Sequence, residues 1–330
     1  MTRLSTAAAA LLLAVQPAHA AWHSDEAAIM GTGMRVELWL EDERAAKEAI
    51  DSGWREMHRI DRLMSTYKDD SEISAVNREA AQHPVEISAE LFDLIEESLE
   101  LSRLSNGAFD ITYASVGYLY DYREHRKPSD EQIEAALPAI DYRHVKLDEE
   151  AGTVAFDAPG VRVDLGGIAK GYAVERCVDL LREQGVEHAI VTAGGDSRIL
   201  GDRRGKPWIV GIRDPRERGR IVARLPLADE AISTSGDYER YFEEDGERYH
   251  HIISPATGRS VDTVRSATVI GPNATRTDGL STAIFVLGPE KGLELIEGLP
   301  DVEAVIVDAQ GHLHYSSGFE QPRPGQSPSE

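Results

Sequence analysis

The chain has 330 residues and a formal charge of −23, with 58 acidic against 35 basic side chains. This excess of carboxylates argues against nucleic acid as a partner and against an anionic membrane surface, because both would repel the protein. Cys177 is the only cysteine, so an internal disulfide and a thiolate metal cluster are excluded.

Residues 1–20 have the pattern of a secretion signal. Arg3 supplies a basic start, residues 7–15 are apolar, and residues 18–20 (Ala-His-Ala) match a small-residue cleavage site. The apolar run is too short to cross a bilayer, which argues against direct membrane insertion. We expect a signal peptide cleaved near Ala20, no lipid anchor because no cysteine adjoins the cleavage point, and a periplasmic location in a bacterium.

The first part of the mature chain predicts a strand followed by two amphipathic helices. Residues 32–40 partly alternate apolar and polar side chains, as in a half-buried strand. Apolar residues then recur at three- and four-residue spacing over residues 42–64, which predicts a helix with one buried face. After a polar loop at residues 68–71, a second helix is expected to have Ser88 as its N-cap and to end at residues 105–107.

The rest of the chain is richer in strands. Short helices are expected at residues 127–138, after residue 168, and at residues 277–287 and 291–297. The Asp245-Gly246 dipeptide predicts a hairpin between two further strands. Strands are expected at residues 145–147, 153–156, 161–165, 189–193, 208–212, 221–225, 231–234, 238–242, 248–253, 265–270, 304–307 and 312–315.

These elements indicate one α+β domain over residues 21–315, with mixed or antiparallel sheets and packed helices. Regular strand-helix-strand units are few, which argues against a doubly wound parallel sheet. Residues 316–330, rich near their end in Pro, Gly and Ser, are expected to form a flexible tail.

Residues 163–172 combine an apolar run, Gly166-Gly167 and a helix start that carries Lys170. Glycines allow a ligand to approach the backbone, and a helix N-terminus offers N–H groups to an anion. The pattern is typical of phosphate binding, although its residue order is not that of a Walker P-loop. An ordinary strand-to-helix turn would also fit these residues.

Asp278 and Thr282 lie four positions apart on a predicted helix, so both side chains point the same way. A carboxylate and a hydroxyl are hard oxygen ligands of the kind that Mg²⁺ accepts. The alternative is an acidic residue that favours the helix dipole next to a buried threonine.

Four other residues could take part in the chemistry. Strand alternation puts His250 and His251 on opposite faces, so at most one can enter a given site as a general base. Neither histidine has the spacing of a zinc motif. Tyr67 and Phe109 each follow a helix end, where an aromatic ring could stack on a planar cofactor or could simply belong to the core.

The order of these motifs along residues 28–315 resembles the bacterial FAD:protein FMN transferases, the ApbE family. Eight motifs carry the resemblance: Met30-Gly31-Thr32, Ser65-Thr66-Tyr67, Gly107-Ala108-Phe109-Asp110, Val163-Asp164 through Ala169-Lys170-Gly171-Tyr172, Ala193-Gly194-Gly195-Asp196, Ile232-Ser233-Thr234-Ser235-Gly236, His251-Ile252-Ile253 with Pro255 and Thr257-Gly258, and Asp278 with Thr282.

The resemblance implies an ApbE-like, T-fold-like architecture and an exported, Mg²⁺-dependent flavin transferase. Such an enzyme would join the FMN half of FAD to a threonine or serine of an acceptor protein, typically a subunit of a membrane-bound electron-transfer complex, and release AMP. Gly167, through its carbonyl, Asp278 and Thr282 would bind Mg²⁺. The implied FAD contacts are Met30, Tyr67, Ala108, Phe109, Asp110, Asp164, Lys170, His251, Ile252 and Ile253.

Pyrophosphate cleavage needs cations near the phosphates and a base for the acceptor hydroxyl. We expect Lys170 to be such a cation and His251 to be the base, with Asp110 or Asp164 as the alternative base. Two rival functions remain open at this point. One is an FAD pyrophosphatase that uses water and yields FMN and AMP, and the other is a periplasmic flavin-binding protein without turnover.

Overall fold

The computed structural model describes residues 21–217 and 219–319. The predicted signal peptide, residues 1–20, and residues 320–330 of the predicted tail lie outside the described residues. Within the described ranges, no helix has both the length and the apolar character needed to cross a membrane.

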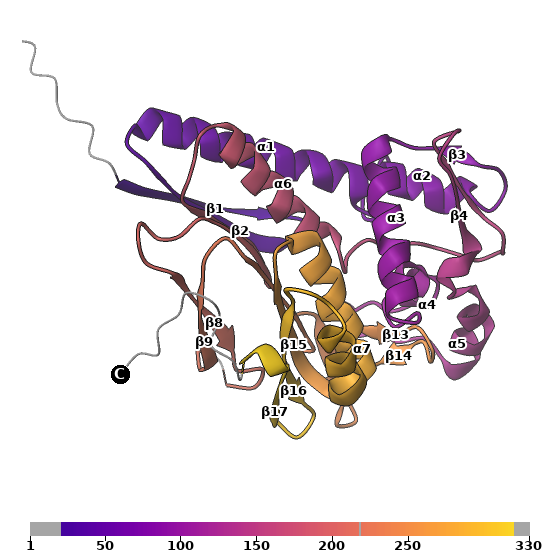
Figure 1. Ribbon diagram of the computed structural model, residues 1–330. Coiled ribbons are helices and arrows are strands. Elements are labelled where there is room, and N and C mark those ends of the chain that lie inside the picture. The colour runs from indigo at the N-terminus through magenta and orange to yellow at the C-terminus, as the bar shows by residue number, and fades with distance from the viewer. Residues whose placement is uncertain (1–20, 218, 320–330) are drawn as a thin grey trace, which may run out of the picture.

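An eight-stranded sheet forms the centre of the protein, and every pair of neighbouring strands in it is antiparallel (Figure 1). In spatial order the strands are β1 (Ala21–Ile29), β2 (Thr32–Leu40), β6 (Ala189–Ala193), β7 (Asp196–Leu200), β10 (Ala231–Gly236), β15 (Val264–Gly271), β16 (Glu303–Asp308) and β17 (Leu313–Tyr315).

Three long helices, α1 (Glu43–Met64), α6 (Ala169–Glu183) and α7 (Ala274–Glu297), pack against this sheet and against one another (Figure 1). Their apolar faces supply fully buried side chains such as Met57 and Phe285. Cys177 of α6 is also fully buried, and burial raises the pKa of its thiol to about 12. It therefore has the inert packing role that its place on an apolar helix face predicts.

Smaller elements form a second region beside α7 and at the end of α1 (Figure 1). The helices are α2 (Glu72–Glu79), α3 (Ala89–Leu104), α4 (Ala114–Gly117) and α5 (Asp130–Ala136), with 3-10 turns at Ile111–Tyr113, Leu137–Ala139 and Tyr142–His144. A small sheet has the order β3 (Val85–Glu86), β5 (Thr153–Phe156), β4 (Val145–Asp148). Three hairpins complete the fold: β8 (Trp208–Arg213) with β9 (Ile221–Leu227), β11 (Tyr241–Glu244) with β12 (Glu247–His250), and β13 (Ile253–Ser254) with β14 (Arg259–Ser260).

The predicted α+β class with antiparallel sheets is confirmed. So is the hairpin turn at Asp245-Gly246, where both residues have positive φ, 53° and 83°. The sequence pattern missed β1, α2 and β7, and the two helices expected at residues 277–287 and 291–297 form one element with a kink at Gly288 (φ 81°) and Pro289.

The strand predicted at residues 161–165 is wrong. Three consecutive backbone N–H groups in this segment donate to non-strand partners: Arg162 to Ser115 Oγ (3.0 Å), Val163 to Asn77 Oδ1 (2.7 Å) and Asp164 to the carbonyl of Ile111 (3.0 Å). The segment is therefore held by side chains and a loop that are far away in sequence.

Residues 316–319, the start of the predicted tail, pack onto the body of the protein. Ser316 is 1% exposed, and its Oγ accepts a hydrogen bond from Ala304 N of β16 at 2.9 Å. Ser317–Phe319 form a 3-10 turn.

Candidate functional site

Lys170, in the first turn of α6, lies between two buried carboxylates. Its Nζ is 2.9 Å from Asp196 Oδ2 at the start of β7 and 3.3 Å from Asp278 Oδ2 on α7. Asp196 and Asp278 are 1% and 2% exposed, whereas the Lys170 side chain is 25% exposed. We call these three residues the lysine-carboxylate cluster.

Two negative charges face one positive charge in this cluster. Burial by itself would lower the pKa of Lys170, but Asp196 and Asp278 outweigh it and raise that pKa above its ordinary value. Burial and the charge of the neighbouring Asp196 raise the pKa of Asp278 to about 7, although Lys170 opposes the shift. Apart from the Lys170 ion pair, neither carboxylate oxygen of Asp196 has a partner among the described residues. The cluster therefore has unused capacity for a further cation.

The three predicted magnesium ligands lie at this cluster. A side chain on Gly167 would come within 3.3 Å of Thr282 Oγ1, so Gly167 lies directly against the α7 turn that follows Asp278. Thr282 Oγ1 also lies 3.1 Å from Ser235 Oγ of β10. A carbonyl, a carboxylate and a hydroxyl beside an excess of buried negative charge fit Mg²⁺ chemically.

This donor set is poor in charged ligands. Within the part of the chain that the structure describes, no group of three or more His, Cys, Asp or Glu side chains could hold a metal ion. The predicted set contains a single carboxylate, so a cation there would depend on neutral oxygens and on ligand phosphates or water. Magnesium binding stays a prediction.

The helix start at α6 offers less to an anion than its sequence predicts. The backbone N–H of Gly171 donates to Asp278 Oδ2 at 2.9 Å, and those of Ile168 and Ala169 donate to the carbonyl of Leu165. These amides are therefore used within the protein. Gly171 is needed for close helix contact, because a Cβ there would lie 2.2 Å from the carbonyl oxygen of Ala274 on α7.

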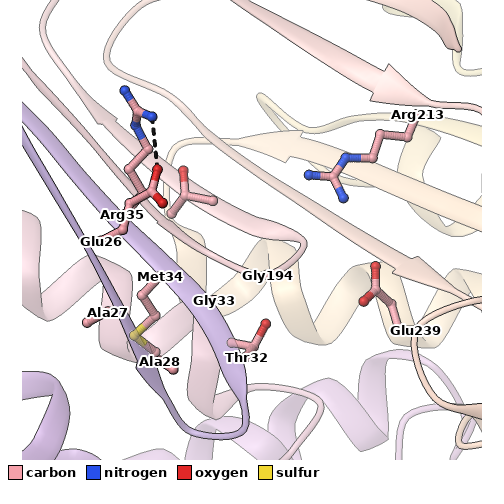
Figure 2. A pocket seen from close by; sticks show the side chains of 11 residues that line it. Glu26, Ala27, Ala28, Thr32, Gly33, Met34, Arg35, Gly194, Arg213 and Glu239 are labelled. Atoms are coloured by element: carbon pink, nitrogen blue, oxygen red, sulfur yellow. Dashed lines mark hydrogen bonds and ion pairs between the residues drawn. The ribbon is translucent and has the colours of Figure 1, made fainter. Parts of the chain in front are cut away.

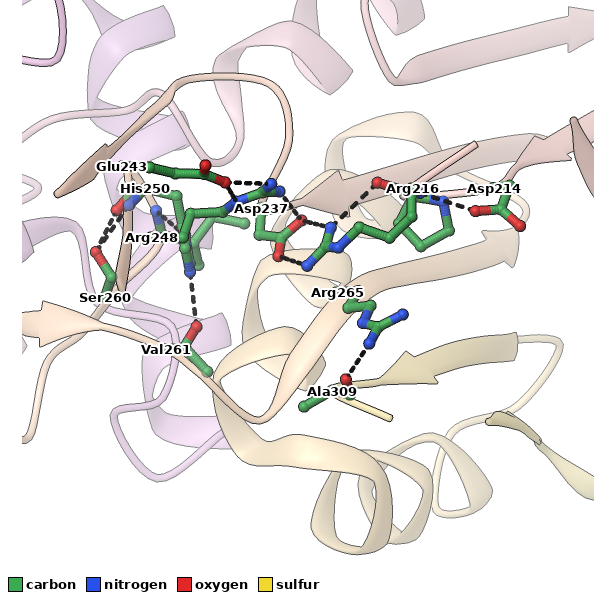
Figure 3. Close-up of polar contacts among 12 residues, drawn as sticks. Asp214, Arg216, Asp237, Glu243, Arg248, His250, Ser260, Val261, Arg265 and Ala309 are labelled. Atoms are coloured by element: carbon green, nitrogen blue, oxygen red, sulfur yellow. Dashed lines mark hydrogen bonds and ion pairs between the residues drawn. The ribbon is translucent and has the colours of Figure 1, made fainter. Parts of the chain in front are cut away.

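His250 has a structural role (Figure 3). Its ring is 2% exposed, its Nε2 donates to the carbonyl of Val261 at 2.6 Å, and its Nδ1 accepts from Ile252 N at 3.3 Å. The ring also packs edge-on against Phe285 of α7, with centroids 5.6 Å apart. These contacts fix the segment that carries the next residue, His251, against the helix of Asp278 and Thr282.

His251 follows β12, and its backbone N–H donates to the carbonyl of Arg240 at 3.1 Å. Its Nδ1 is buried and has no partner among the described residues. Burial, together with the charges of Arg240, His250 and Lys170, lowers the pKa of His251 to about 3. The imidazole is therefore neutral at physiological pH, as a general base must be.

A second group of predicted contacts surrounds Asp164. The Asp164 carboxylate accepts from Thr66 Oγ1 (2.7 Å), Gly166 N (2.7 Å) and the hydroxyl of Tyr113 (3.3 Å). The neighbouring Tyr67 is 84% exposed. Such exposure does not fit a core aromatic residue, so the ring is free to stack on a planar ligand.

The Gly107–Asp110 segment packs beside the site, where the Phe109 ring lies next to Gly167. Asp110 is 6% exposed and accepts from Thr112 N (2.8 Å), Thr112 Oγ1 (2.6 Å) and Tyr142 N (2.8 Å), which makes it a loop cap. Burial raises its pKa, but its oxygens are engaged, so the alternative role of Asp110 as a base loses support. Other predicted contacts, Ala108, Phe109, Ile252 and Ile253, are buried, and Met30 is a partly buried residue at the β1–β2 turn with φ 53°.

An open depression of about 580 Å³ lies beside the β1–β2 turn (Figure 2). It adjoins the site, because Met30 lies in the β1–β2 turn and Asp196 follows the lining residue Gly194 after one residue. The predicted FAD contacts are not among its lining residues. Its lining residues are Glu26, Ala27, Ala28, Thr32, Gly33, Met34, Arg35, Thr192, Gly194, Arg213 and Glu239.

Asp237 joins two hairpins near the site (Figure 3). Both of its oxygens pair with Arg216, at 2.7 and 2.6 Å, and Arg248 of β12 lies 3.4 Å away. Because Arg216 lies in the β8–β9 connection, this network holds the β11–β12 hairpin and thus the approach to His251.

Sequence reasoning assigned no role to Asp196 or Ser235, although both belong to motifs that it singled out. Asp196 pairs with Lys170, and Ser235 contacts Thr282. The signal that could have identified Asp196 is its position directly after the Gly194-Gly195 turn. A Cβ on Gly195 would lie 2.4 Å from the carbonyl oxygen of Thr234, so the turn itself packs against β10.

Comparison with curated proteins finds relatives over most of the chain. The chain is 34% identical over 292 residues to an FAD:protein FMN transferase of Vibrio cholerae, covering 86% of each sequence. It is 32% identical over 317 residues to an FAD:protein FMN transferase of Escherichia coli, covering 90% of each.

Solved structures give the same picture. The ApbE protein of Thermotoga maritima superposes with a TM-score of 0.85 at 34% identity, over 91% of this chain and 98% of that one. The flavin transferase ApbE of Vibrio cholerae gives a TM-score of 0.81 at 30% identity, over 91% and 99%. The ApbE family model matches residues 30–306. This chain therefore belongs to the ApbE family.

Proposed function

We propose that the protein is an FAD:protein FMN transferase that moves FMN from FAD to a threonine or serine hydroxyl of an acceptor protein and releases AMP. The main support for the proposal is an arrangement of residues. The lysine-carboxylate cluster lies beside Gly167 and Thr282. Asp278 and Thr282 belong to α7, and His250 packs the segment of His251 against the same helix. The names of the relatives with 32–34% identity support the same activity.

The chain supplies separate places for the two parts of the substrate. Tyr67 and Asp164 would contact the flavin, because the exposed ring of Tyr67 offers stacking and the Asp164 carboxylate is hydrogen-bonded to Thr66, the residue before Tyr67. Magnesium, held by the Gly167 carbonyl, Asp278 and Thr282, would offset the negative charge of the pyrophosphate when bound. Lys170 offsets part of the negative charge of Asp196 and Asp278.

The reaction exchanges the phosphoanhydride bond of FAD for a phosphoester bond to the acceptor. A bond forms between the acceptor hydroxyl oxygen and the phosphorus on the flavin side of FAD, and the bond from that phosphorus to the AMP half breaks. His251 accepts the hydroxyl proton on a ring nitrogen, since its imidazole is neutral. AMP leaves with the bridging oxygen.

The acceptor that we propose is a subunit of a membrane-bound electron-transfer complex, and the location is the periplasm. The signal-like residues 1–20 support export. The excess of carboxylates suggests that the docking surface avoids strongly acidic partners.

The proposal is tested by incubating the purified protein with FAD, Mg²⁺ and exported subunits of electron-transfer complexes from the same organism. We expect AMP release and an acceptor whose intact mass rises by one FMN group. AMP release with every acceptor unchanged would instead indicate a pyrophosphatase, and no AMP release with any acceptor would indicate a flavin-binding protein. Transfer that survives His251→Ala over a full pH profile would remove the base role of His251.

A further inference from the structure

Lys170, the cation expected to face the phosphates, is already committed to protein carboxylates. Its Nζ contacts both Asp196 and Asp278, at 2.9 and 3.3 Å, and the two carboxylates together exceed its charge. In the absence of other ions, the lysine-carboxylate cluster has a net negative charge and would repel a pyrophosphate. A further cation of this chain near the same place would therefore favour pyrophosphate binding, in addition to the proposed Mg²⁺.

Arg240 is a cation beside the predicted FAD contacts that the fold leaves available. It is exposed and lies directly before β11, and no hydrogen bond or ion pair involves its side chain among residues 21–217 and 219–319. By contrast, the neighbouring Arg216 and Arg248 are both paired with Asp237. An arginine that is free in a protein with so many carboxylates is available for a ligand.

The surroundings of Arg240 place it between two predicted FAD contacts. Its Nη2 would lie 3.4 Å from a Cβ on Gly31, in the same turn as Met30. Its carbonyl accepts the backbone N–H of His251 at 3.1 Å. The main chain of Arg240 is thus hydrogen-bonded to that of His251, the proposed base, while the Arg240 side chain reaches the β1–β2 turn.

We propose that Arg240 binds the pyrophosphate of FAD and is the phosphate-facing cation of this site. This inference rests on the proposed function, since it assumes FAD as the ligand. Each phosphate of that bridge carries one negative charge, and a guanidinium can donate two parallel hydrogen bonds to one phosphate. Lys170 then neutralises protein carboxylates, and Arg240 binds the phosphates of the ligand.

The test compares ligands that differ in their phosphates. Binding of FAD and of riboflavin, which has no phosphate, is measured by flavin fluorescence for the wild type, Arg240→Gln and Arg240→Lys. We expect Arg240→Gln to weaken FAD binding about tenfold or more and riboflavin binding less than about twofold. Arg240→Lys should recover part of the FAD affinity, because it keeps the charge but not the fork geometry.

Two further measurements make the result decisive. The salt dependence of FAD affinity should be smaller for Arg240→Gln than for the wild type, because one charge pair is gone. Arg44→Gln, which changes an exposed arginine in the first turn of α1, at the opposite end of that helix from Tyr67, is the matched control and should leave both affinities unchanged.

Unchanged FAD affinity and salt dependence in Arg240→Gln would overturn the inference, and so would an equal loss for FAD and riboflavin. The failure of the proposed function looks different: the wild type would then bind FAD through Arg240 but transfer nothing to any acceptor.

Discussion

At the scale of single residues, Asp278 carries a buried charge that is unfavourable for folding and that the proposed site uses. Its carboxylate is buried beside Asp196, and only one lysine offsets the two. Such an arrangement is unfavourable for folding unless a further cation joins it. A ligand role for Asp278 gives a physical reason why the carboxylate is kept.

Replacing Asp278 with asparagine should therefore stabilise the metal-free protein at alkaline pH. The folded-state pKa of Asp278 is about 7, against an ordinary value of 3.8, so the folded protein holds a proton that the unfolded chain has lost, and stability falls as pH rises through that window. We expect Asp278→Asn to raise Tm at pH 8 by roughly 2–4 °C, to give no gain near pH 4, and to abolish transfer.

Thermal unfolding in the presence of a chelator measures this difference. Asp51→Asn changes a half-exposed carboxylate of α1 and should leave Tm within about 1 °C at both pH values. A lower Tm for Asp278→Asn than for the wild type at pH 8 would contradict the charge imbalance.

His251 gives a second pH prediction, of opposite sign. Its folded-state pKa is lowered to about 3 from 6.5, so the unfolded chain binds a proton that the folded protein does not, and stability is lost as pH falls from about 6.5 toward 3. In His251→Asn the decrease of Tm between pH 7 and pH 5 should be smaller than in the wild type. His83→Asn, at an exposed histidine, is the control, and an equal decrease in all three proteins would show that His251 is not buried as a neutral group.

At the scale of elements, the contact between α6 and α7 assembles the site. Gly171 allows these helices to approach until its backbone N–H reaches Asp278. A Cβ there would lie 2.2 Å from the Ala274 carbonyl oxygen and 2.6 Å from Asp278 Cβ, so the helices would have to separate.

Gly171→Ala should therefore destabilise the protein by about 1–3 kcal/mol and weaken transfer, because the ligands of α7 move away from Lys170. Gly33→Ala is the matched control, since a Cβ on Gly33 meets no atom within 4 Å. Urea unfolding should place the control within about 0.5 kcal/mol of the wild type. Equal stability of the two variants would show that the helix contact is not tight.

Local chemistry made several elements predictable. The Ser88 hydroxyl caps α3 by accepting from Leu91 N, as predicted. Asp42 caps α1 by accepting from Ala45 N, so that helix begins where the apolar spacing predicts. Residues 161–165 have the composition of a strand, but their partners Asn77 and Ser115 are 86 and 47 positions away. Periodicity contains no information about such distant partners.

In the site, too, some features follow from local sequence and others depend on contacts between distant residues. The helical spacing of Asp278 and Thr282 is local and could be read from the sequence, as could the glycines before Lys170. The pairing of Lys170 with Asp196 depends on how α6 lies on β7, and the engagement of Asp110 by Tyr142 N depends on a loop 32 residues away. These contacts change the expected role of each residue, and only the fold reveals them.

At the scale of the whole molecule, the antiparallel sheet acts as a platform that brings distant motifs together. Motifs from β7, β10, α6 and α7 meet at the lysine-carboxylate cluster, while the β11–β12 hairpin contributes Arg240 and His251 beside the β1–β2 turn. The motif order along the chain could identify the family, because the spacing of motifs reflects this platform.

The central claim, transfer of FMN through its phosphate, is tested most directly by fragment mass spectrometry of the acceptor after incubation with the protein, FAD and Mg²⁺. We expect a single threonine or serine that carries FMN through a phosphoester, with one AMP released for each FMN added. An acceptor that stays unmodified while AMP accumulates, or one that carries flavin through a ring carbon on cysteine or histidine, would contradict it.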